Sequence, residues 1–192
     1  MDTVNFTANH IKNVEILKKC SDKYKPCEVA LVELDACSQK DRNTVDGINR
    51  IWDYSFTAFT YDDMVKFSES NYLADRLHVY ALTTQKGKYE KVTPKKILGI
   101  VELIEDTCSG NKIEVLQTKP TLLPDMKHPN PKYKHVGNQL ISYLKDRHLN
   151  RQLYVNPTKT AVEFYKKQGF EWQPGFEYRN RMWIAPKNSP KK

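Results

Sequence analysis

Hydrophobic and polar positions along this 192-residue chain follow the period of a strand in some segments and the period of a helix in others. Residues 28–35 form an apolar, β-branched run that is typical of a strand. Residues 46–59 place apolar side chains on one helical face, and Thr60 with Asp62 or Asp63 offers a cap for residues 62–70, so both segments are predicted as helices. Residues 9–19 carry apolar positions near helical spacing, which predicts a further helix ahead of the first strand.

Three consecutive strands are predicted in the middle of the chain. Residues 77–81 alternate apolar and polar side chains, and residues 96–104 and 112–119 follow after short turns. Strands joined by short turns are typical of an antiparallel meander. A loop with four prolines over residues 120–134 then leads into a helix predicted for residues 136–149.

The last part of the chain mixes the two periods. Residues 152–155 are predicted as a strand, and residues 158–168 as a helix that ends at Gly169 in a left-handed cap. Residues 170–172 and 178–184 are predicted as the closing strands. The order is therefore strand, two helices, three strands, helix, strand, helix and two strands, which predicts an α/β domain of the α+β type.

The composition is that of an ordinary globular domain, with 39% hydrophobic and 28% charged residues. The longest apolar run, at residues 97–101, is far too short to cross a bilayer, and residues 1–10 do not resemble a secretory signal. A cytoplasmic protein without a membrane segment is expected. The four cysteines lack the spacing of metal ligands, so no metal site is predicted.

The net charge of +8 is distributed unevenly. The first 96 residues hold 15 Lys and Arg against 14 Asp and Glu, whereas the last 96 hold 16 against 9. An excess of positive charge in one half favours an anionic partner there. Nucleic acid and a phosphorylated cofactor such as coenzyme A are both candidates, and composition does not distinguish them.

A candidate anion site lies where the chain enters the helix at residue 136. A helix N-terminus presents unpaired N–H groups and the positive end of the helix dipole, and Gly137 would let a phosphate oxygen approach the backbone closely. The positive side chains nearby are Lys127, Lys132, Lys134 and His135. Taken alone, the pattern fits an anion site and an ordinary helix start with a glycine about equally well.

A second motif lies in the helix predicted for residues 158–168. It reads Ala161-Val162-Glu163-Phe164-Tyr165-Lys166-Lys167-Gln168-Gly169-Phe170. With the upstream glycine, it resembles the GNAT acetyltransferase family, whose phosphate loop is Gln/Arg-x-x-Gly-x-Gly/Ala and whose later helix carries Ala-x-x-Phe/Leu-Tyr-x-Lys-x-Gly-Phe. The resemblance is strong over residues 97–172 and rests on the order of elements before that.

The resemblance implies the architecture and the general activity. It implies a single acetyltransferase-like domain over residues 1–186, with a mixed, mostly antiparallel central sheet of about seven strands flanked by about four helices. Residues 187–192 are expected to form a disordered basic tail. The activity implied is the transfer of an acetyl group from acetyl-CoA to a primary amine of a small molecule or a protein.

The resemblance also implies roles for individual residues. Tyr165 would protonate the departing thiolate, and Glu114 matches the place of the general base in some members, with Glu102 on the neighbouring strand as a competing candidate. The third meander strand would pair with the pantetheine amides, and the helix entry would hold the pyrophosphate. The implied cofactor-binding residues are Leu116, Gln117, Thr118, Lys134, His135, Val136, Gly137, Asn138, Gln139, Asn156 and Thr158.

Three positions depart from the family pattern. Lys134 stands where Gln or Arg is usual, and Gln139 where Gly or Ala is usual. Thr158 replaces a frequent Asn, for which Asn156 is a substitute two residues earlier. The side chain at position 139 either points away from a bound phosphate or crowds it.

Because of these departures from the family pattern, other functions remain open. One is a module on the same fold that binds coenzyme A or a partner without catalysis. Another is an acetyltransferase that acts on RNA-linked amines, although no nucleic-acid motif is recognised in the chain. An exposed edge in the last strands would also allow a homodimer. The acceptor amine is not identified by the sequence.

Overall fold

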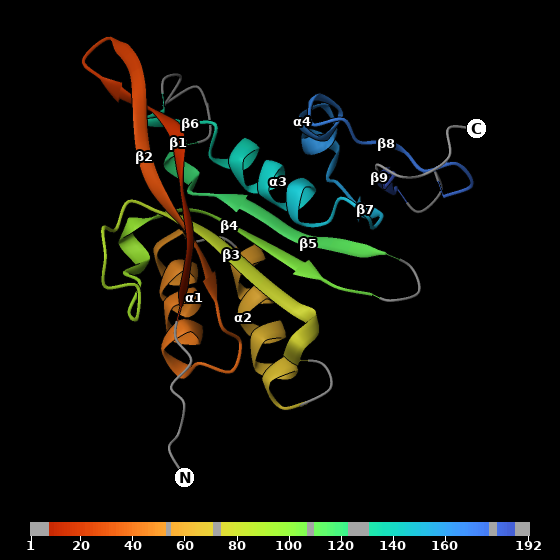
Figure 1. The fold of residues 1–192 in the computed structure, drawn as a ribbon, viewed down its shortest axis with the longest axis horizontal. Helices are drawn as coiled ribbons and strands as arrows, with labels where there is room; N and C mark the ends of the chain where they lie inside the picture. The colour runs from red at the N-terminus through yellow and green to blue at the C-terminus, as the bar shows by residue number, and fades with distance from the viewer. Residues whose placement is uncertain are drawn as a thin grey trace.

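One mixed β-sheet runs through the molecule (Figure 1). The computed structural model describes residues 8–52, 55–70, 74–106, 110–122, 131–176 and 180–186, with the backbone alone over 55–58. Within these residues nine strands hydrogen-bond in the order β6-β1-β2-β3-β4-β5-β7-β9-β8. Their bounds are β1 Asn9–Cys20, β2 Lys23–Leu34, β3 Leu77–Thr83, β4 Ile97–Ile104, β5 Asn111–Thr118, β6 Tyr133–Lys134, β7 Leu153–Val155, β8 Glu171–Trp172 and β9 Met182–Ile184.

Helices cover both faces of the sheet (Figure 1). The pair α1 (Gln39–Trp52) and α2 (Ser55–Ser68) lies on one face, and α3 (Val136–Arg147) and α4 (Val162–Lys167) lie on the other. Each face has its own cluster of buried apolar side chains. The mixed, mostly antiparallel α/β fold is therefore confirmed. No described helix is both long and apolar enough to span a membrane.

The prediction of a helix over residues 9–19 is wrong, because this segment forms strand β1. It pairs antiparallel with β2 along its whole length, and Val14 and Ile16 face the apolar cluster that lies against α3. These two positions follow a period of two, whereas the helix prediction relied on the spacing of residues 11, 14 and 17, and the long partner strand decides between the two patterns. Strands β1 and β6 raise the strand count from the expected seven to nine.

The predicted meander of β3, β4 and β5 is confirmed, with antiparallel pairing at both steps. Its second ladder contains an irregularity. Glu102 faces Val115 while the next residue, Leu103, faces Ile113, so Glu114 is the extra residue of a β-bulge. A bulge bends its strand and increases the local twist.

The helices before the meander begin earlier than predicted, at Gln39 and Ser55 instead of residues 46 and 62. The start of α1 is fixed by Ser38, whose side-chain oxygen accepts from the N–H of Asp41 at 3.3 Å and whose carbonyl accepts from Arg42 at 3.0 Å. This is an N-cap arrangement, and it precedes the apolar stripe on which the prediction rested. The tail over residues 187–192 lies outside the described residues.

Gly99 allows α3 to lie close to strand β4. A Cβ atom at this position would stand 2.6 Å from Cγ1 of Val136 and 3.2 Å from Cδ1 of Leu140. A glycine inside a strand often marks such a close approach of another element. It places the N-terminal turn of α3 directly over the middle of the sheet.

Candidate active site

Strands β5 and β7 run parallel for three residues and then separate. Pairing joins residues 111–113 to residues 153–155, and the bulge at Glu114 follows at once. Beyond it, the edge of β5 over residues 114–118 has no strand partner on this side within the described chain. A cleft of about 760 Å³ lies between this edge, the start of α3 and α4.

Almost every residue predicted for the site lines this cleft. The lining includes Glu114, Leu116, Gln117, Thr118, Lys134, His135, Val136, Gly137, Asn138, Asn156, Thr158 and Tyr165. Gln139 is the exception, because its Nε2 donates a hydrogen bond of 2.8 Å to the backbone oxygen of Glu15 in β1. Its side chain therefore points away from the cleft.

The start of α3 directs unpaired backbone N–H groups at the cleft. His135 precedes the helix in a left-handed conformation with φ of 69°, and its carbonyl accepts from the N–H of Gln139 at 3.0 Å. The N–H groups of residues 136–138 come before this first helical bond, and no described side chain caps them. Because these residues line the cleft, the helix start directs the positive end of the helix dipole at it.

Gly137 also sets the distance between two helices. A Cβ atom at this position would lie 3.3 Å from Cζ and 3.5 Å from Cε2 of Phe164, and 3.8 Å from Cγ2 of Thr118. Phe164 of α4 thus approaches the backbone of α3 where a side chain would otherwise stand. The glycine serves the packing of the cleft wall as well as access to the backbone.

Tyr165 lines the cleft from α4 and is only 5% exposed. Its ring makes edge-to-face contacts with Phe164 and Phe170, at centroid distances of 5.2 Å and 5.3 Å. Burial raises the pKa of its phenol above the ordinary value. The phenol is therefore protonated at neutral pH and able to donate a proton.

Two carboxylates flank the β4–β5 bulge. Glu114 is exposed, lines the cleft and forms an ion pair with Lys112. Glu102 is fully buried beside Thr60 and Asp63 of α2. Burial, and then the contact with Asp63, raises the pKa of Glu102 well above its usual range. Of the two candidate bases, Glu114 has access to the cleft.

One wall of the cleft had no clear signal in the sequence. Pro120, Leu122, Pro131 and Tyr133, from the two ends of the proline-containing loop, line this wall. Prolines restrict the backbone but do not indicate which side chains will face a site. Residues 123–130 of the same loop, with Lys127, lie outside the described residues.

Lys134 lines the cleft, but its ammonium group lies over an aromatic ring of the β1–β2 hairpin. Its Nζ is 4.0 Å from the ring centroid of Tyr24, whose hydroxyl donates a 2.6 Å hydrogen bond to the carbonyl of Pro131. The cation–π contact and the hydrogen bond hold the loop before α3 against the hairpin. Lys134 therefore contributes to the position of the helix start.

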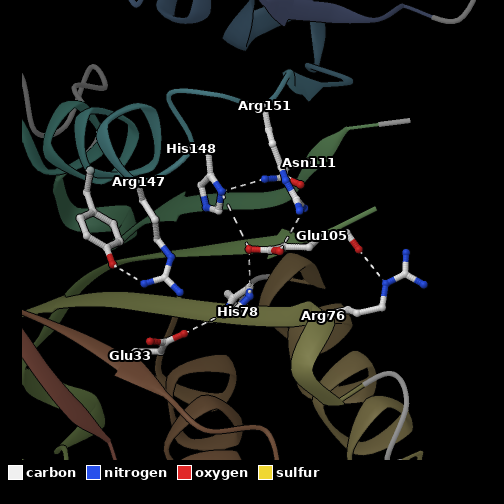
Figure 2. Close-up of polar contacts among 9 residues, drawn as sticks. Glu33, Arg76, His78, Glu105, Asn111, Arg147, His148 and Arg151 are labelled. Atoms are coloured by element: carbon white, nitrogen blue, oxygen red, sulfur yellow. Dashed lines mark hydrogen bonds and ion pairs between the residues drawn. The ribbon is translucent and has the colours of Figure 1, made fainter. Parts of the chain in front are cut away.

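A separate polar cluster lies at the other end of α3 (Figure 2). His78 stands between two carboxylates, with Nδ1 at 2.8 Å from Glu33 and Nε2 at 3.3 Å from Glu105. His148 follows the helix and accepts a 2.7 Å hydrogen bond from the amide of Asn111. The cluster ties the end of α3 to the sheet. In the part of the chain that the structure describes, no group of His, Cys, Asp and Glu side chains could hold a metal ion.

Comparison with known proteins gives the fold a name. No protein-family model and no curated protein matches the sequence. A protein from Desulfovibrio desulfuricans, described as an acetyltransferase of the GNAT family, aligns over 81% of this chain and 96% of its own, with a TM-score of 0.51 and 14% identity. Tetrahymena GCN5 aligns over 78% and 91%, with a TM-score of 0.47 and 13% identity. The Bacillus subtilis N-acetyltransferase YlbP, solved with coenzyme A, aligns over 75% and 90%, with a TM-score of 0.44 and 12% identity. The fold is that of the GNAT acetyltransferases, as the two motifs implied.

Proposed function

We propose that this chain is an acetyl-CoA-dependent N-acetyltransferase that transfers the acetyl group to a primary amine by direct attack. In this proposal Tyr165 is the general acid and Glu114 the general base. The observation that carries it is one cleft that combines the unpartnered edge of β5, the N–H groups at the start of α3 and the side chain of Tyr165. Such a cleft offers a strand edge for amides, an anion site and a proton donor.

The residues of the cleft fit acetyl-CoA. The backbone of residues 116–118 would pair with the amides of pantetheine as a sheet accepts an added strand. The N–H groups of residues 136–138 would hold the pyrophosphate. Gln139 does not obstruct this site, because its side chain is bonded to Glu15. When bound, acetyl-CoA supplies the acetyl group as an activated thioester.

Tyr165 would donate a proton to the thiolate that leaves. Its raised pKa keeps the phenol protonated at neutral pH, which is the form that a general acid needs. The edge-to-face contacts with Phe164 and Phe170 fix the ring, so the hydroxyl needs little ordering during the reaction.

Glu114 would accept the proton that the amine loses before its attack. Its position on the bulge and its exposure to the cleft support this role. Glu102 does not line the cleft, and its raised pKa favours the protonated form at neutral pH. Glu114→Gln should therefore lower kcat more than Glu102→Gln, with stability measured in parallel for both.

The first experiment is a calorimetric titration of the protein with acetyl-CoA. The variant to compare is Asn138→Asp, because an acidic residue in the first helical turn favours the helix but repels a phosphate. Ser142→Asp places the same charge on an exposed part of α3 outside the cleft and serves as the control. We expect Asn138→Asp to weaken binding by roughly tenfold or more and the control to leave it unchanged. No binding by the wild-type protein would sink the proposal.

Catalysis is tested separately by the release of free thiol with a panel of polyamines, aminoglycosides and lysine peptides. Thiol release that depends on an amine and falls in Tyr165→Phe supports an enzyme. Binding of acetyl-CoA without thiol release for any amine in the panel would favour the non-catalytic module. The two experiments therefore distinguish a failure of binding from a failure of catalysis.

A further inference from the structure

The β1–β2 hairpin extends beyond the rest of the sheet (Figure 1). Strand β3 pairs with β2 only over residues 30–34, so the outer part of the hairpin, residues 16–27, projects past it. We call residues 16–27 the hairpin arm. One edge of the arm is joined to β6, which leads directly into the start of α3. The arm therefore lies beside the phosphate end of the proposed acetyl-CoA site.

Two lysines face each other across this arm. The pairs Val14–Val29 and Ile16–Cys27 precede Lys18–Lys25 in the ladder, and Val14, Val29 and Ile16 belong to the apolar cluster against α3. Because every second pair of a ladder shares a face, Lys18 and Lys25 project from this same face.

No ion pair neutralises the two facing lysines within the described part of the chain. The ion pairs of lysine found among the described residues join Lys112 to Glu114 and Lys166 to Glu163, so neither Lys18 nor Lys25 takes part in one. Like charges directly opposite each other in a ladder are destabilising. Protection of an exposed strand edge explains lysines in the arm, but it does not require two of them to face each other. The arrangement favours an anion shared between the two ammonium groups.

The lysine pair adjoins the wall of the cleft. Lys18 is the ladder partner of Tyr133, and Tyr133 lines the cleft. The ammonium of Lys132 lies 5.9 Å from the centroid of the same ring. Positive side chains of the arm and of the loop thus gather around Tyr133, three residues before the start of α3.

We propose that Lys18 and Lys25 form a second phosphate subsite, which binds the 3′-phosphate on the ribose of coenzyme A. This inference rests on the proposed function. It assigns the pyrophosphate to the start of α3 and the phosphate monoester to the hairpin arm. The arm is then a specificity element that distinguishes coenzyme A from its 3′-dephospho form.

The test is a titration with acetyl-CoA and with acetyl-3′-dephospho-CoA. The variant is Lys18→Gln/Lys25→Gln, and the control is Lys66→Gln/Lys95→Gln, which removes the same charge at exposed positions on the α1–α2 side. We expect the wild-type protein and the control to prefer acetyl-CoA by about five- to tenfold, since two solvent-exposed ion pairs are at stake. The variant should bind both donors alike, and added salt should reduce the wild-type preference.

Several outcomes would overturn the inference while leaving the proposed function intact. Equal affinity of the wild-type protein for the two donors is one, and a preference that survives in Lys18→Gln/Lys25→Gln is another. If the variant loses affinity for both donors by the same factor, the arm attracts the negatively charged cofactor in general and does not recognise the 3′-phosphate. If neither donor binds the wild-type protein, the proposed function fails instead. Thermal melts check folding, and the variant should melt no lower than the wild type because a like-charge pair is removed.

Discussion

The loss of stability at acidic pH tests the polar cluster at the end of α3, because His148 in this cluster binds a proton less readily in the folded protein than in the unfolded chain (Figure 2). The residue is 8% exposed, and its Nδ1 accepts from the amide of Asn111 while lying 3.9 Å from a carboxylate oxygen of Glu105. Burial, opposed by the charge of Glu105 and reinforced by that of Arg147, lowers the pKa of His148 from 6.5 to about 4. The folded protein thus keeps the ring neutral at pH values at which the unfolded chain protonates it.

A depressed histidine pKa couples unfolding to proton uptake. The stability that His148 contributes is fully present above pH 6.5, falls as the pH falls below that value, and is lost by about pH 4. At about 1.4 kcal/mol for each pKa unit, the change amounts to at most about 3 kcal/mol. For a domain of this size it corresponds to roughly 6 to 12 °C in Tm.

The assay is thermal unfolding between pH 4 and pH 8 for the wild-type protein and His148→Asn. The asparagine oxygen stands near the place of Nδ1 and keeps an acceptor for Asn111, but it does not titrate. The wild-type Tm should fall more steeply than that of the variant between pH 6.5 and pH 4, and the two curves should run parallel above pH 7. His10→Asn, at an exposed position, controls for the loss of an imidazole from the surface. Parallel curves over the whole range would refute the reasoning.

Three further predictions test other parts of the structure. Asp41 is buried, which raises its pKa to about 6, so its contribution to stability is lost as the pH rises from 3.8 through 6. Asp41→Asn, which keeps an acceptor for the N–H of Asp35, should raise Tm relative to wild type at pH 7 more than at pH 4 in the same melts. Tyr165→Phe should lower kcat by about 100-fold or more with little change in the Kd for acetyl-CoA, measured by thiol release and calorimetry. Gly137→Ala should lower Tm by only a few degrees, because a gain in helix propensity of about 1 kcal/mol offsets part of the crowding of Phe164, and Phe164→Leu should restore it.

The parts of the cleft that could be predicted have local sequence signals. The start of α3 at Val136 and the motif over residues 161–170 each occupy one short segment, in which a glycine, a cap or an apolar stripe acts on its own neighbours. The meander was predictable for the same reason, since alternation and short turns are properties of adjacent residues. These segments contain about half of the residues that line the cleft.

The parts that could not be predicted depend on contacts between distant segments. Strand β6 has two residues and exists as a strand only because it pairs with Leu17 and Lys18, more than a hundred positions earlier. The wall at Tyr133 follows from that pairing, so no local pattern indicates it. The bulge at Glu114 likewise depends on the register between two strands, which the period of either strand alone does not fix.

The segment mistaken for a helix explains how the chain tolerates its departures from the family pattern. Gln139 would crowd a phosphate if its side chain faced the cleft, and β1 removes it by accepting its hydrogen bond at Glu15. Lys134 replaces a residue that the family uses in the loop, and β2 holds its ammonium over Tyr24. These two departures of the three are thus accommodated by the same hairpin, and neither could be judged from the loop alone. A helix start that departs from the motif thus keeps its backbone N–H groups open to the cleft, because residues 9–34 fold as two strands beside it.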